Sequence, residues 1–558
     1  MNITNRRVAL SAILLITAAY WCGVLGISLN SDDYQYIASM APIHSIGDVF
    51  RPFVSHDANP SFFRPLANMT MAADFLLFGW SGMGFHLTNL LFHLAATLLV
   101  FYFVRDIFDL SEKESLWTAL IFGILASHEY NLVVDTARAD VMVAIFVMLV
   151  LLLQKRATRG WAYQAGALGA YGLALCSKEI AIMVVPFLLV IAWVRDGRDA
   201  QGRKGLALQL TSYLAVTILF YFYHAHFTAS ALASQPLAAE GAHSITALLR
   251  NGGYALGYIV LPLDLETATS LLTRYRTLTM CVGAILCLAL IAVMYSNRSQ
   301  YKSYMLPLVF SLLTGSVLLL NFERWRVYLP SVGIITIGVL LICRMKSTRG
   351  RCMSIALCVT LLVFDVYRGL SAQSEWRTST AIRDQLKSSL TQLLASTSHR
   401  PLTIGFLTTP SKLGSASVMQ LGLSALVQRA EADRISLRNR ESGTTTGVRL
   451  DAWTAVEVNS LSSNEGYRGL TVQQTGTHSF LIAVPDSSHL QLYPTGEIQN
   501  HIDRRDKTWH VSDTLRASEE IGIVRRVTFG IVKAVEVNVL DTSATLLSFD
   551  GNHGFNKP

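Results

Sequence analysis

The sequence predicts a polytopic α-helical membrane protein with about eleven transmembrane helices, followed by a C-terminal soluble α+β domain. Three observations predict this fold class. Hydrophobic residues make up 51% of the 558 positions and charged residues only 15%, whereas soluble domains carry about 25% charged residues. Apolar runs of spanning length recur through the first two thirds of the chain. After position 370 the pattern changes to short alternating runs, so we predict a membrane domain over 1–370 and a soluble domain over 371–558.

The first predicted span, Val8–Ile27, follows the basic pair Arg6-Arg7 and is long enough to cross the bilayer and remain uncleaved. Ten further apolar runs follow it at intervals. They are Phe85–Val104, Ser115–Tyr130, Asp140–Leu153, Trp161–Cys176, Ile180–Val194, Leu206–Tyr223, Leu278–Tyr295, Tyr304–Asn321, Val327–Cys343 and Cys352–Leu370.

The distribution of basic residues predicts the orientation of these spans. The segments placed inside hold 17 Lys and Arg residues, and the outer segments before Ser371 hold 9. This is the positive-inside pattern, so the N-terminus is predicted to be cytoplasmic and the C-terminal domain to lie outside, in the periplasm if the membrane is a bacterial inner membrane. Counting Ile245–Leu261 as a further span would place basic segments outside, so we interpret it as a helix on or dipping into the outer surface.

The first outer loop, Ser28–Gly84, is too long for a simple connection. Within it, Pro65–Phe78 begins with a proline at a plausible helix start and contains Asp74 as its only charge. Such a stretch is typical of a helix that lies along the membrane interface. We predict that this loop covers a cavity above Asp32 and Asp33.

The segment after the last span combines one helix with several strands. Helical periodicity covers Ser374–Ser396, and Gly, Pro, Asn and Asp separate the β-branched runs that follow. The predicted strands are Thr403–Leu407, Ala455–Val458, Ser479–Val484, Val527–Val532, Val535–Leu540 and Ala544–Phe549. The seven cysteines all fall in or beside hydrophobic spans without metal-ligand spacing, so we interpret them as buried apolar side chains.

Charged residues gather at the predicted outer ends of the spans, all on one side of the membrane. A charge in hydrocarbon is costly, so such residues belong at an interface or in a wet cavity. The candidates are Asp32, Asp33, Arg64, Glu129, Arg138, Asp140, Lys178, Glu179 and Arg326, with Tyr328 two positions after the last of these.

Carboxylates alternating with Arg and Lys suit transfer of a group from a phosphate-linked lipid. An acceptor hydroxyl needs a general base within hydrogen-bond reach, and a carboxylate can take its proton. Charge that develops on a departing phosphate is stabilised by preorganised cations, either the bidentate fork of Arg or the point charge of Lys. The glycine-rich turn of a nucleotide-binding domain is absent from the sequence. The basic residues are not clustered on a soluble face, so nucleic acid is not a predicted partner.

Each candidate also has a purely structural interpretation. Asp32-Asp33 could fix the depth of the first span, and Arg138 and Asp140 could pair with each other. Lys178-Glu179 could be an interfacial snorkelling pair, and Arg326 could anchor the end of a span. The polar side chains His86, Thr88, Asn89 and His93 are interpreted as hydrogen-bonding groups between helices rather than metal ligands.

The polar motifs occur in one order between Asp32 and Ser331, which is about half of the chain. The order is Asp32-Asp33, Phe63-Arg64-Pro65-Leu66, the run from Gly84 to His93, Arg138-Ala139-Asp140, Ser177-Lys178-Glu179 and Arg326-Val327-Tyr328-Leu329-Pro330-Ser331. This ordered set resembles the GT-C superfamily of polyprenyl-phosphate-sugar glycosyltransferases, in style closest to the protein O-mannosyltransferases that carry tetratricopeptide repeats and to their bacterial relatives. Ser127-His128-Glu129 and Ala137-Arg138 depart from the family pattern, and the soluble tail lacks the repeats. These departures bear on the acceptor more than on the reaction class.

The resemblance implies a role for each candidate. Asp33 or Asp32 is the catalytic base, with Asp33 preferred. The donor phosphate is bound by Arg64, Arg138, Lys178 and Arg326, and support or orientation comes from Asp140, Glu179, Tyr328 and Glu129. No metal-binding residues are predicted, and dependence on a divalent metal is left open.

The resemblance therefore predicts a membrane glycosyltransferase with an undecaprenyl-phosphate-type sugar donor. Its acceptor would be an extracytoplasmic glycan, lipopolysaccharide or protein at a bacterial inner membrane, and its other partners membrane lipids. An aminoarabinose-type lipid A transferase or an oligosaccharide ligase is the alternative within the enzyme class. A transporter or flippase is the non-enzyme alternative. It is disfavoured because the charges gather at outer ends rather than at the midplane and no internal repeat is evident.

Overall fold

The computed structural model describes residues 3–40, 42–57, 62–195, 200–232, 245–260, 301–320, 322–344 and 348–396, together with strands between 402 and 556. The chain divides into two compact units. The first comprises Met1–Gly26 and Met40–Ser371, and the second comprises Ile27–Ser39 and Ala372–Pro558. Each unit is described by itself.

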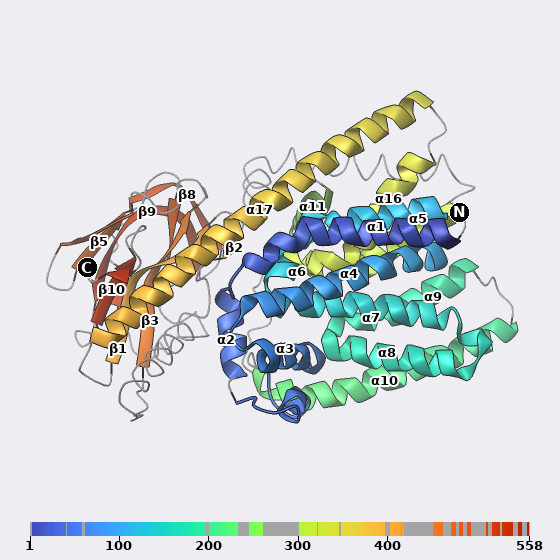
Figure 1. Ribbon diagram of the computed structural model, residues 1–558, viewed down its shortest axis with the longest axis horizontal. Helices are drawn as coiled ribbons and strands as arrows, with labels where there is room; N and C mark the ends of the chain where they lie inside the picture. The colour runs from blue at the N-terminus through green and yellow to red at the C-terminus, as the bar shows by residue number, and fades with distance from the viewer. Residues whose placement is uncertain are drawn as a thin grey trace. The chain divides into compact units, whose positions relative to one another are not determined.

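The first unit is a bundle of helices (Figure 1). Its α-helices are α1 Ile3–Trp21, α3 Pro65–Phe78, α4 Gly82–Ile107, α5 Glu112–Ile124, α6 Glu129–Val133, α7 Arg138–Gln154, α8 Trp161–Ser177, α9 Val184–Arg195, α10 Ala200–Leu232, α11 Ile245–Val260, α14 Tyr301–Thr314, α15 Ser316–Leu320, α16 Tyr328–Cys343 and the first half of α17 Thr348–Ser396. Short 3-10 turns lie between them, including η1 Cys22–Gly26, η2 Asp48–Phe53, η3 Ala126–His128, η4 Asp135–Ala137, η6 Glu179–Met183 and η8 Arg324–Val327.

Several of these helices can cross a membrane, as the apolar runs predict. Five helical stretches in the described part of the chain are long and apolar enough, namely Ile3–Gly26, Gly82–Ile107, Asp135–Gln154, Arg324–Cys343 and Thr348–Gln392. Shorter apolar helices accompany them. The predicted span Leu278–Tyr295 lies outside the described residues, so the total of eleven spans stays a prediction.

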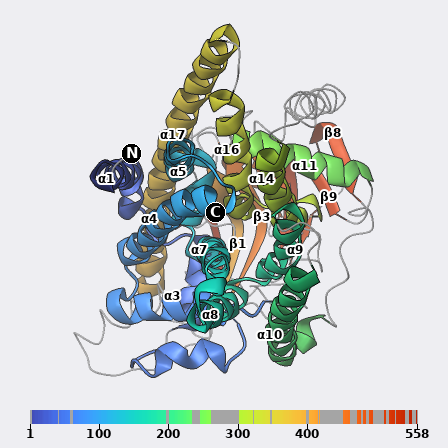
Figure 2. The same ribbon diagram turned by 90° about the vertical axis from the view of Figure 1, so that its right-hand side faces the viewer.

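Helices α4 and α7 form the centre of the bundle. Val100, Phe101 and Phe103 of α4 are fully buried, and most of α7 between Val141 and Leu152 is buried on every face. A helix that is apolar all round belongs in an interior. Both views place α4 and α7 between α5 on one side and α8 on the other (Figures 1 and 2). The first turn of α7 therefore projects from the middle of the bundle.

Two predicted spans are interrupted. The run Ser115–Tyr130 was expected to be one helix, but α5 ends at Ile124 because Leu125 adopts an extended conformation, and η3 and α6 follow. The run Tyr304–Asn321 is divided into α14 and α15 at Gly315. A Cβ at Gly315 would lie 2.7 Å from the carbonyl oxygen of Ser311, so the interruption depends on glycine.

A capping box begins α5. The hydroxyl of Ser111 accepts a hydrogen bond from the backbone N–H of Glu114, and the Glu114 carboxylate accepts one from the backbone N–H of Ser111. The same carboxylate pairs with Arg344 just after α16 (N···O 2.8 Å). The start of α5 is thus fixed to the end of α16.

Removing this cap is expected to lower stability by a modest amount. Ser111→Ala leaves the N–H of Glu114 without its acceptor, which costs about 1 kcal/mol. A shift of the thermal unfolding midpoint of the purified protein measures the loss. Thr360→Ala on α17, whose exposed hydroxyl donates to the carbonyl oxygen of Ala356 in the same helix, is the control. An equal shift in both variants would contradict a specific role for the cap.

The second unit contains α2 Ser31–Ser39, the second half of α17 and a mixed sheet. Its strands are β1 Leu402–Leu413, β2 Ala416–Ser417, β3 Leu450–Ser460, β4 Thr471–Gln474, β5 Ser479–Ala483, β6 Ser488–Leu492, β7 Trp509–Val511, β8 Arg516–Val524, β9 Val527–Val539, β10 Thr545–Phe549 and β11 Phe555–Asn556. The strand order is β11-β10-β1-β3-β6-β9-β5-β4. Strand β1 pairs in parallel with β3 and β10, and the other described pairings are antiparallel.

Two boundaries differ from the sequence prediction here. The predicted strands Val527–Val532 and Val535–Leu540 form the single strand β9, because Lys533 and Ala534 continue the extended chain rather than turning. The predicted span Cys352–Leu370 and the predicted helix Ser374–Ser396 likewise form the single helix α17. Neither junction, 533–534 or 371–373, contains a proline or glycine that would end the strand or helix.

Candidate functional site: paired cations and an acidic helix start

The acidic pair lies in the first turn of α2. Asn30 precedes this helix, and the Asp33 carboxylate accepts a hydrogen bond from the Asn30 backbone N–H (3.1 Å). The Asp33 side chain is fully buried. A carboxylate at the third helical position that binds back to the capping residue is half of a capping box. Asp33 therefore has a structural function of its own, and the side chain of Asp32 lies outside the described part.

The residues around Asp33 are fixed by α17 within the second unit. The buried guanidinium of Arg383 donates to the carbonyl oxygen of Ser28 (3.2 Å) and to the hydroxyl of Ser379 (2.6 Å). The Ser28 backbone N–H donates to the hydroxyl of Thr380 (3.1 Å). Two contacts thus hold the chain that leads into α2 against one face of α17, and the bond to Ser379 orients Arg383 within α17.

Arg64 forms a bidentate ion pair with Glu179. It is the last residue before α3, where Pro65 starts the helix. Its Nη2 lies 2.9 Å from Oε1 of Glu179 and its Nε lies 3.4 Å from Oε2. The guanidinium also stacks over the ring of Phe62 at 4.1 Å. Arg64 is largely buried, whereas the Glu179 side chain is half exposed.

Lys178 is paired with Asp140 beside this contact. Lys178 directly follows α8 and Asp140 lies in the first turn of α7, and Nζ and Oδ2 are 2.5 Å apart. Both side chains are buried. The pKa of Lys178 is lowered because burial disfavours the ammonium, and the charge of Arg64 adds to this shift while that of Asp140 opposes it. Arg64 and Lys178 are therefore close enough to act on each other electrostatically.

The same two cations dominate the titration of Glu179. Partial burial raises the pKa of its carboxyl, but the charge and hydrogen bonds of Arg64 and the charge of Lys178 outweigh it and lower the pKa to about 2. Glu179 is therefore ionised at physiological pH. Two cations and two carboxylates meet where α3, α7 and α8 come together, and an entering phosphate could exchange with a carboxylate there.

Arg138 differs from the other predicted phosphate ligands because it is completely enclosed. Its guanidinium lies 2.6 Å from a carboxylate oxygen of Asp74 and donates to the side chain of Asn89 (2.6 Å) and to the carbonyl oxygen of Phe85 (3.1 Å). Asp135 lies 3.9 Å away. The guanidinium has no solvent exposure. This arrangement favours a role for Arg138 in fixing α3 and α4 to α7, and its contact with the donor phosphate stays a prediction.

The alternative that Arg138 and Asp140 pair with each other is wrong. Arg138 pairs with Asp74 and Asp140 pairs with Lys178. The physical reason is helical geometry, because residues two apart project from nearly opposite faces of a helix. Arg138 therefore points towards α3 and α4, and Asp140 towards the end of α8.

Glu129 is paired with Arg324, a residue that the sequence analysis did not select. The two charged groups lie 3.7 Å apart and both side chains are buried. Arg324 also lies over the ring of Tyr130 at 4.0 Å. The predicted phosphate ligand Arg326 is half buried on the same turn, η8. The pairing of Arg324 ties η8 to the loop between α5 and α7.

Tyr328 supports a buried histidine rather than the cations. Its hydroxyl lies 2.6 Å from Nδ1 of His93, whose Nε2 lies 2.9 Å from the carbonyl oxygen of Gly123. Since a carbonyl can only accept, Nε2 carries the proton and Nδ1 accepts from Tyr328. His93 is thus a hydrogen-bonding group between helices, as predicted. No cluster of three or more His, Cys, Asp or Glu side chains suited to a metal occurs among the described residues.

Three residues of the site were missed because their signals were weak. Asp74 was noted only as the single charge of an apolar helix, although a buried charge in such a helix requires a partner. Asp135 lies three residues before Arg138 and Arg324 directly follows Glu323, and neither position gave a reason to prefer the residue. The partners of Asp74 and Arg324 come from distant segments, so only the fold identifies them.

Comparison with known proteins adds a resemblance in sequence and in fold. No family model matches the chain. "Protein O-mannosyl-transferase TMTC3" from Homo sapiens is 25% identical over 154 residues, which is 26% of this chain and 16% of that protein. The match therefore covers only a small part of the relative's length.

Three solved structures also align with the chain, each at 12% sequence identity. The archaeal oligosaccharyltransferase AglB from Archaeoglobus fulgidus, in complex with an inhibitory peptide and a dolichol-phosphate, aligns over 86% of this chain and 75% of its own (TM-score 0.42). ArnT from Cupriavidus metallidurans bound to undecaprenyl phosphate aligns over 82% of this chain and 94% of its own, with a TM-score of 0.41. The arabinofuranosyltransferase AftD from Mycobacteria aligns over 97% of this chain and 40% of its own, with a TM-score of 0.42. In sequence, the chain is thus similar to a protein O-mannosyl-transferase over about a quarter of its length.

Proposed function

We propose that this protein transfers a sugar from a polyprenyl-phosphate-linked donor to an acceptor at the outer face of a bacterial inner membrane. The observation that carries the proposal is the pairing of Arg64 with Glu179 and of Lys178 with Asp140 where three helices meet. Two preorganised cations in a mostly buried setting suit a phosphate whose negative charge grows as it leaves. The acceptor is an extracytoplasmic glycan, lipopolysaccharide or protein.

Each cation has a distinct part in the proposed reaction. The forked guanidinium of Arg64 binds two phosphate oxygens, and the ammonium of Lys178 provides a point charge. As the acceptor oxygen bonds to the anomeric carbon, the bond from that carbon to the phosphate oxygen breaks and polyprenyl phosphate departs. Asp140 and Glu179 hold the two cations in place before the donor arrives. Arg326 is retained as a third phosphate ligand. Glu129 supports it indirectly, by pairing with Arg324 on the same turn.

The proton of the acceptor hydroxyl goes to a carboxylate of the acidic pair. We assign this role to Asp32 rather than Asp33, because the Asp33 carboxylate is buried and bonded to the start of its own helix. A base must reach the hydroxyl within hydrogen-bond distance, which an enclosed capping group does less easily. This reverses the preference drawn from sequence alone.

The acidic pair allows the two roles to be separated. Asp32→Asn is expected to lower sugar transfer by about 10²- to 10⁴-fold without changing the thermal unfolding midpoint, because it removes a general base. Asp33→Ala is expected to lower stability by about 1 kcal/mol, because it removes a helix cap. Transfer is measured in membranes with labelled donor, and unfolding on the purified protein. Full activity in both Asp32→Asn and Asp33→Asn would refute the assignment of the base to this pair.

A further inference from the structure

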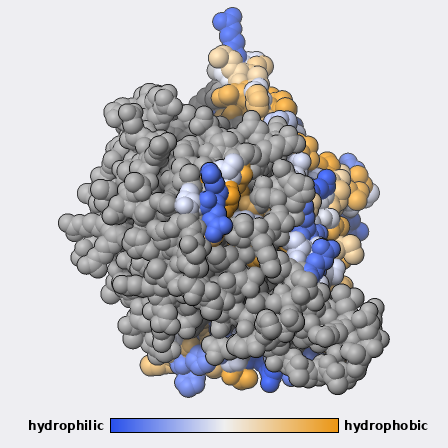
Figure 3. Space-filling model, turned by 90° about the vertical axis from the view of Figure 1, so that its left-hand side faces the viewer, coloured by the Kyte–Doolittle hydropathy of each residue, from blue (hydrophilic) through white to orange (hydrophobic). Residues whose placement is uncertain are grey.

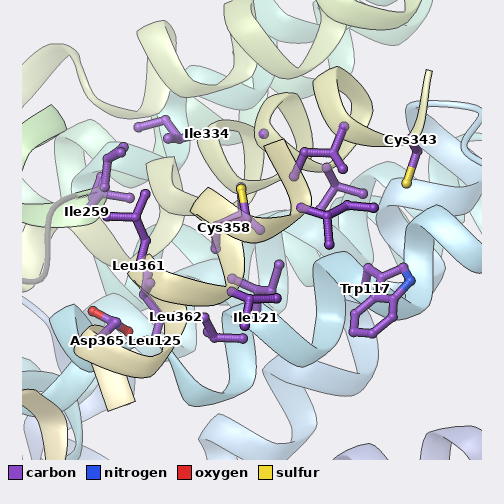
Figure 4. A pocket seen from close by; sticks show the side chains of 17 residues that line it. Trp117, Ile121, Leu125, Ile259, Ile334, Cys343, Cys358, Leu361, Leu362 and Asp365 are labelled. Carbon is purple, nitrogen blue, oxygen red and sulfur yellow. The ribbon is translucent and has the colours of Figure 1, made fainter. Parts of the chain in front are cut away.

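A second site, lined almost entirely by carbon, lies between α5, α11, α16 and α17 (Figure 4). It encloses a cavity of about 370 Å³, which is within the size range of ligand pockets. Among the described residues that line it, Asp365 alone carries a charged side chain. Arg64 and Lys178 of the proposed donor site lie at the ends of α3 and α8, and both ribbon views place α3 and α8 away from α5 and α16 (Figures 1 and 2). The function proposed above therefore does not account for this cavity.

The end of the cavity at Asp365 is closed by satisfied polar groups. The Asp365 carboxylate accepts a hydrogen bond from the backbone N–H of Ala126 (2.9 Å) and lies 3.4 Å from the guanidinium of Arg368. Arg368 in turn donates to the carbonyl oxygen of Tyr258 (3.4 Å). These contacts neutralise the one charge of the lining, so the cavity accepts an apolar occupant. Figure 4 shows Trp117 and Cys343 at the opposite end from Asp365.

One face of α17 leads from this cavity to a basic segment. Ile355, Val359 and Leu362 line the cavity and follow the i, i+4, i+7 spacing of one helical face. Arg351 is four residues before Ile355, so it lies on the same face one turn towards the start of α17. Its side chain is exposed. Arg351 therefore places a positive charge next to the end of the cavity at which Trp117 and Cys343 lie.

The cavity also opens towards the surroundings of α17. Ile355 and Val359 are 45% and 54% exposed although they line it, and Val363 on a neighbouring face is 62% exposed. Figure 3 shows the end of α17 as a mainly hydrophobic surface with a hydrophilic tip. In a membrane, such a surface faces hydrocarbon, and an apolar cavity open to hydrocarbon is filled by it rather than by water.

We propose that this cavity binds one acyl chain of an anionic phospholipid, with the lipid phosphate on Arg351. The charge complementarity commits the site to an anionic headgroup, because Arg349 adds to the positive charge of Arg351 at the start of α17, whereas Arg344 is neutralised by Glu114. The lipid would hold α17 against α5 and α16. The proposal does not depend on the function assigned to Arg64 and Lys178.

Gly338 provides a variant that fills the cavity without disturbing the fold. It lies on the wall formed by α16, and a Cβ at this position would meet nothing within 4 Å. The side chain of Gly338→Leu therefore extends into the cavity, and leucine is a better helix former than glycine. Gly169→Leu on α8 is the matched control, because its Cβ would also meet nothing within 4 Å and it lies outside the cavity.

Quenching of Trp117 by brominated phospholipid tests the proposal. The full-length protein is placed in nanodiscs that contain either brominated phosphatidylglycerol or brominated phosphatidylcholine, and the Trp117 signal is obtained by difference from Trp117→Phe. We expect stronger quenching by phosphatidylglycerol. Gly338→Leu is expected to abolish this preference, Gly169→Leu to keep it, and Arg351→Gln to lower it about fivefold, since one basic residue near an anionic surface contributes about a factor of five.

Two results would overturn the proposal. Equal quenching by the two lipids, unaffected by Gly338→Leu, would mean that Trp117 senses only bulk lipid. Displacement of brominated phosphatidylglycerol by an equimolar amount of undecaprenyl phosphate would assign the cavity to the chain of that lipid instead. Transfer activity is not part of either readout, so failure here leaves the proposed function unaffected.

Discussion

Arg64→Gln is expected to raise the KM for the lipid-linked sugar donor by about 10- to 100-fold, because one charge-assisted contact to phosphate contributes about 1.5–3 kcal/mol. The variant should keep its stability. The partner of Arg64, Glu179, is half exposed and can be solvated when the guanidinium is removed. Initial rates of transfer at varied donor concentration, with unfolding midpoints measured in parallel, test both expectations.

A matched control is available at Arg105, which also forms an ion pair with a carboxylate. Arg105 lies 2.7 Å from Asp106, near the opposite end of α4 from Gly82, and has no part in the proposed site. Arg105→Gln should leave the KM unchanged. If Arg64→Gln also leaves the KM unchanged, Arg64 does not bind the donor and the proposed phosphate site is wrong.

Arg138→Gln is expected to have the largest effect on stability, a loss of about 3–5 kcal/mol. It removes the positive partner of Asp74 and of Asp135, and a buried charge left without its partner is strongly destabilising. The double variant Arg138→Gln/Asp74→Asn should recover part of the loss, because it removes one of the two stranded charges. Thermal unfolding midpoints and size-exclusion profiles of the purified wild-type protein and both variants measure this order of stability.

The same variant decides between the two roles of Arg138. If it positions α3, the double variant regains stability and with it much of the donor affinity. If Arg138→Gln unfolds at the wild-type temperature but loses donor affinity, Arg138 contacts the donor and the role inferred from its burial is wrong. Lys155→Gln, at the exposed end of α7, serves as the stability control.

The helices were predictable from sequence wherever a long apolar run is bounded by clear signals. The run Trp161–Cys176 corresponds to α8 Trp161–Ser177, and the run Val327–Cys343 to α16 Tyr328–Cys343. Pro65 correctly marked the first residue of α3. The division of Ser115–Tyr130 was not predictable, because Ala126 and Ser127 are compatible with a helix and the break depends on Leu125 adopting an extended conformation.

The candidate site was predicted in composition but not in pairing. The sequence identified four polar residues at the ends of spans, namely Arg64, Lys178, Asp140 and Glu179. The structure adds their pairing, Arg64 with Glu179 and Lys178 with Asp140. Each ion pair joins segments that are far apart in sequence, so residue spacing alone favoured neighbours such as Arg138 and Asp140. The capping function of Asp33 depends on where α2 begins, and a boundary of a short helix is not readable from an apolar pattern.

The central claim, that this protein transfers a sugar from a lipid-linked donor, is tested most directly by mass analysis of envelope glycans. Three strains are compared: one with the protein, one lacking it, and one carrying Asp32→Asn/Asp33→Asn at the same membrane level. We predict a glycan that is present in the first strain and smaller by one sugar in the other two. Identical glycan masses in all three strains would contradict the claim.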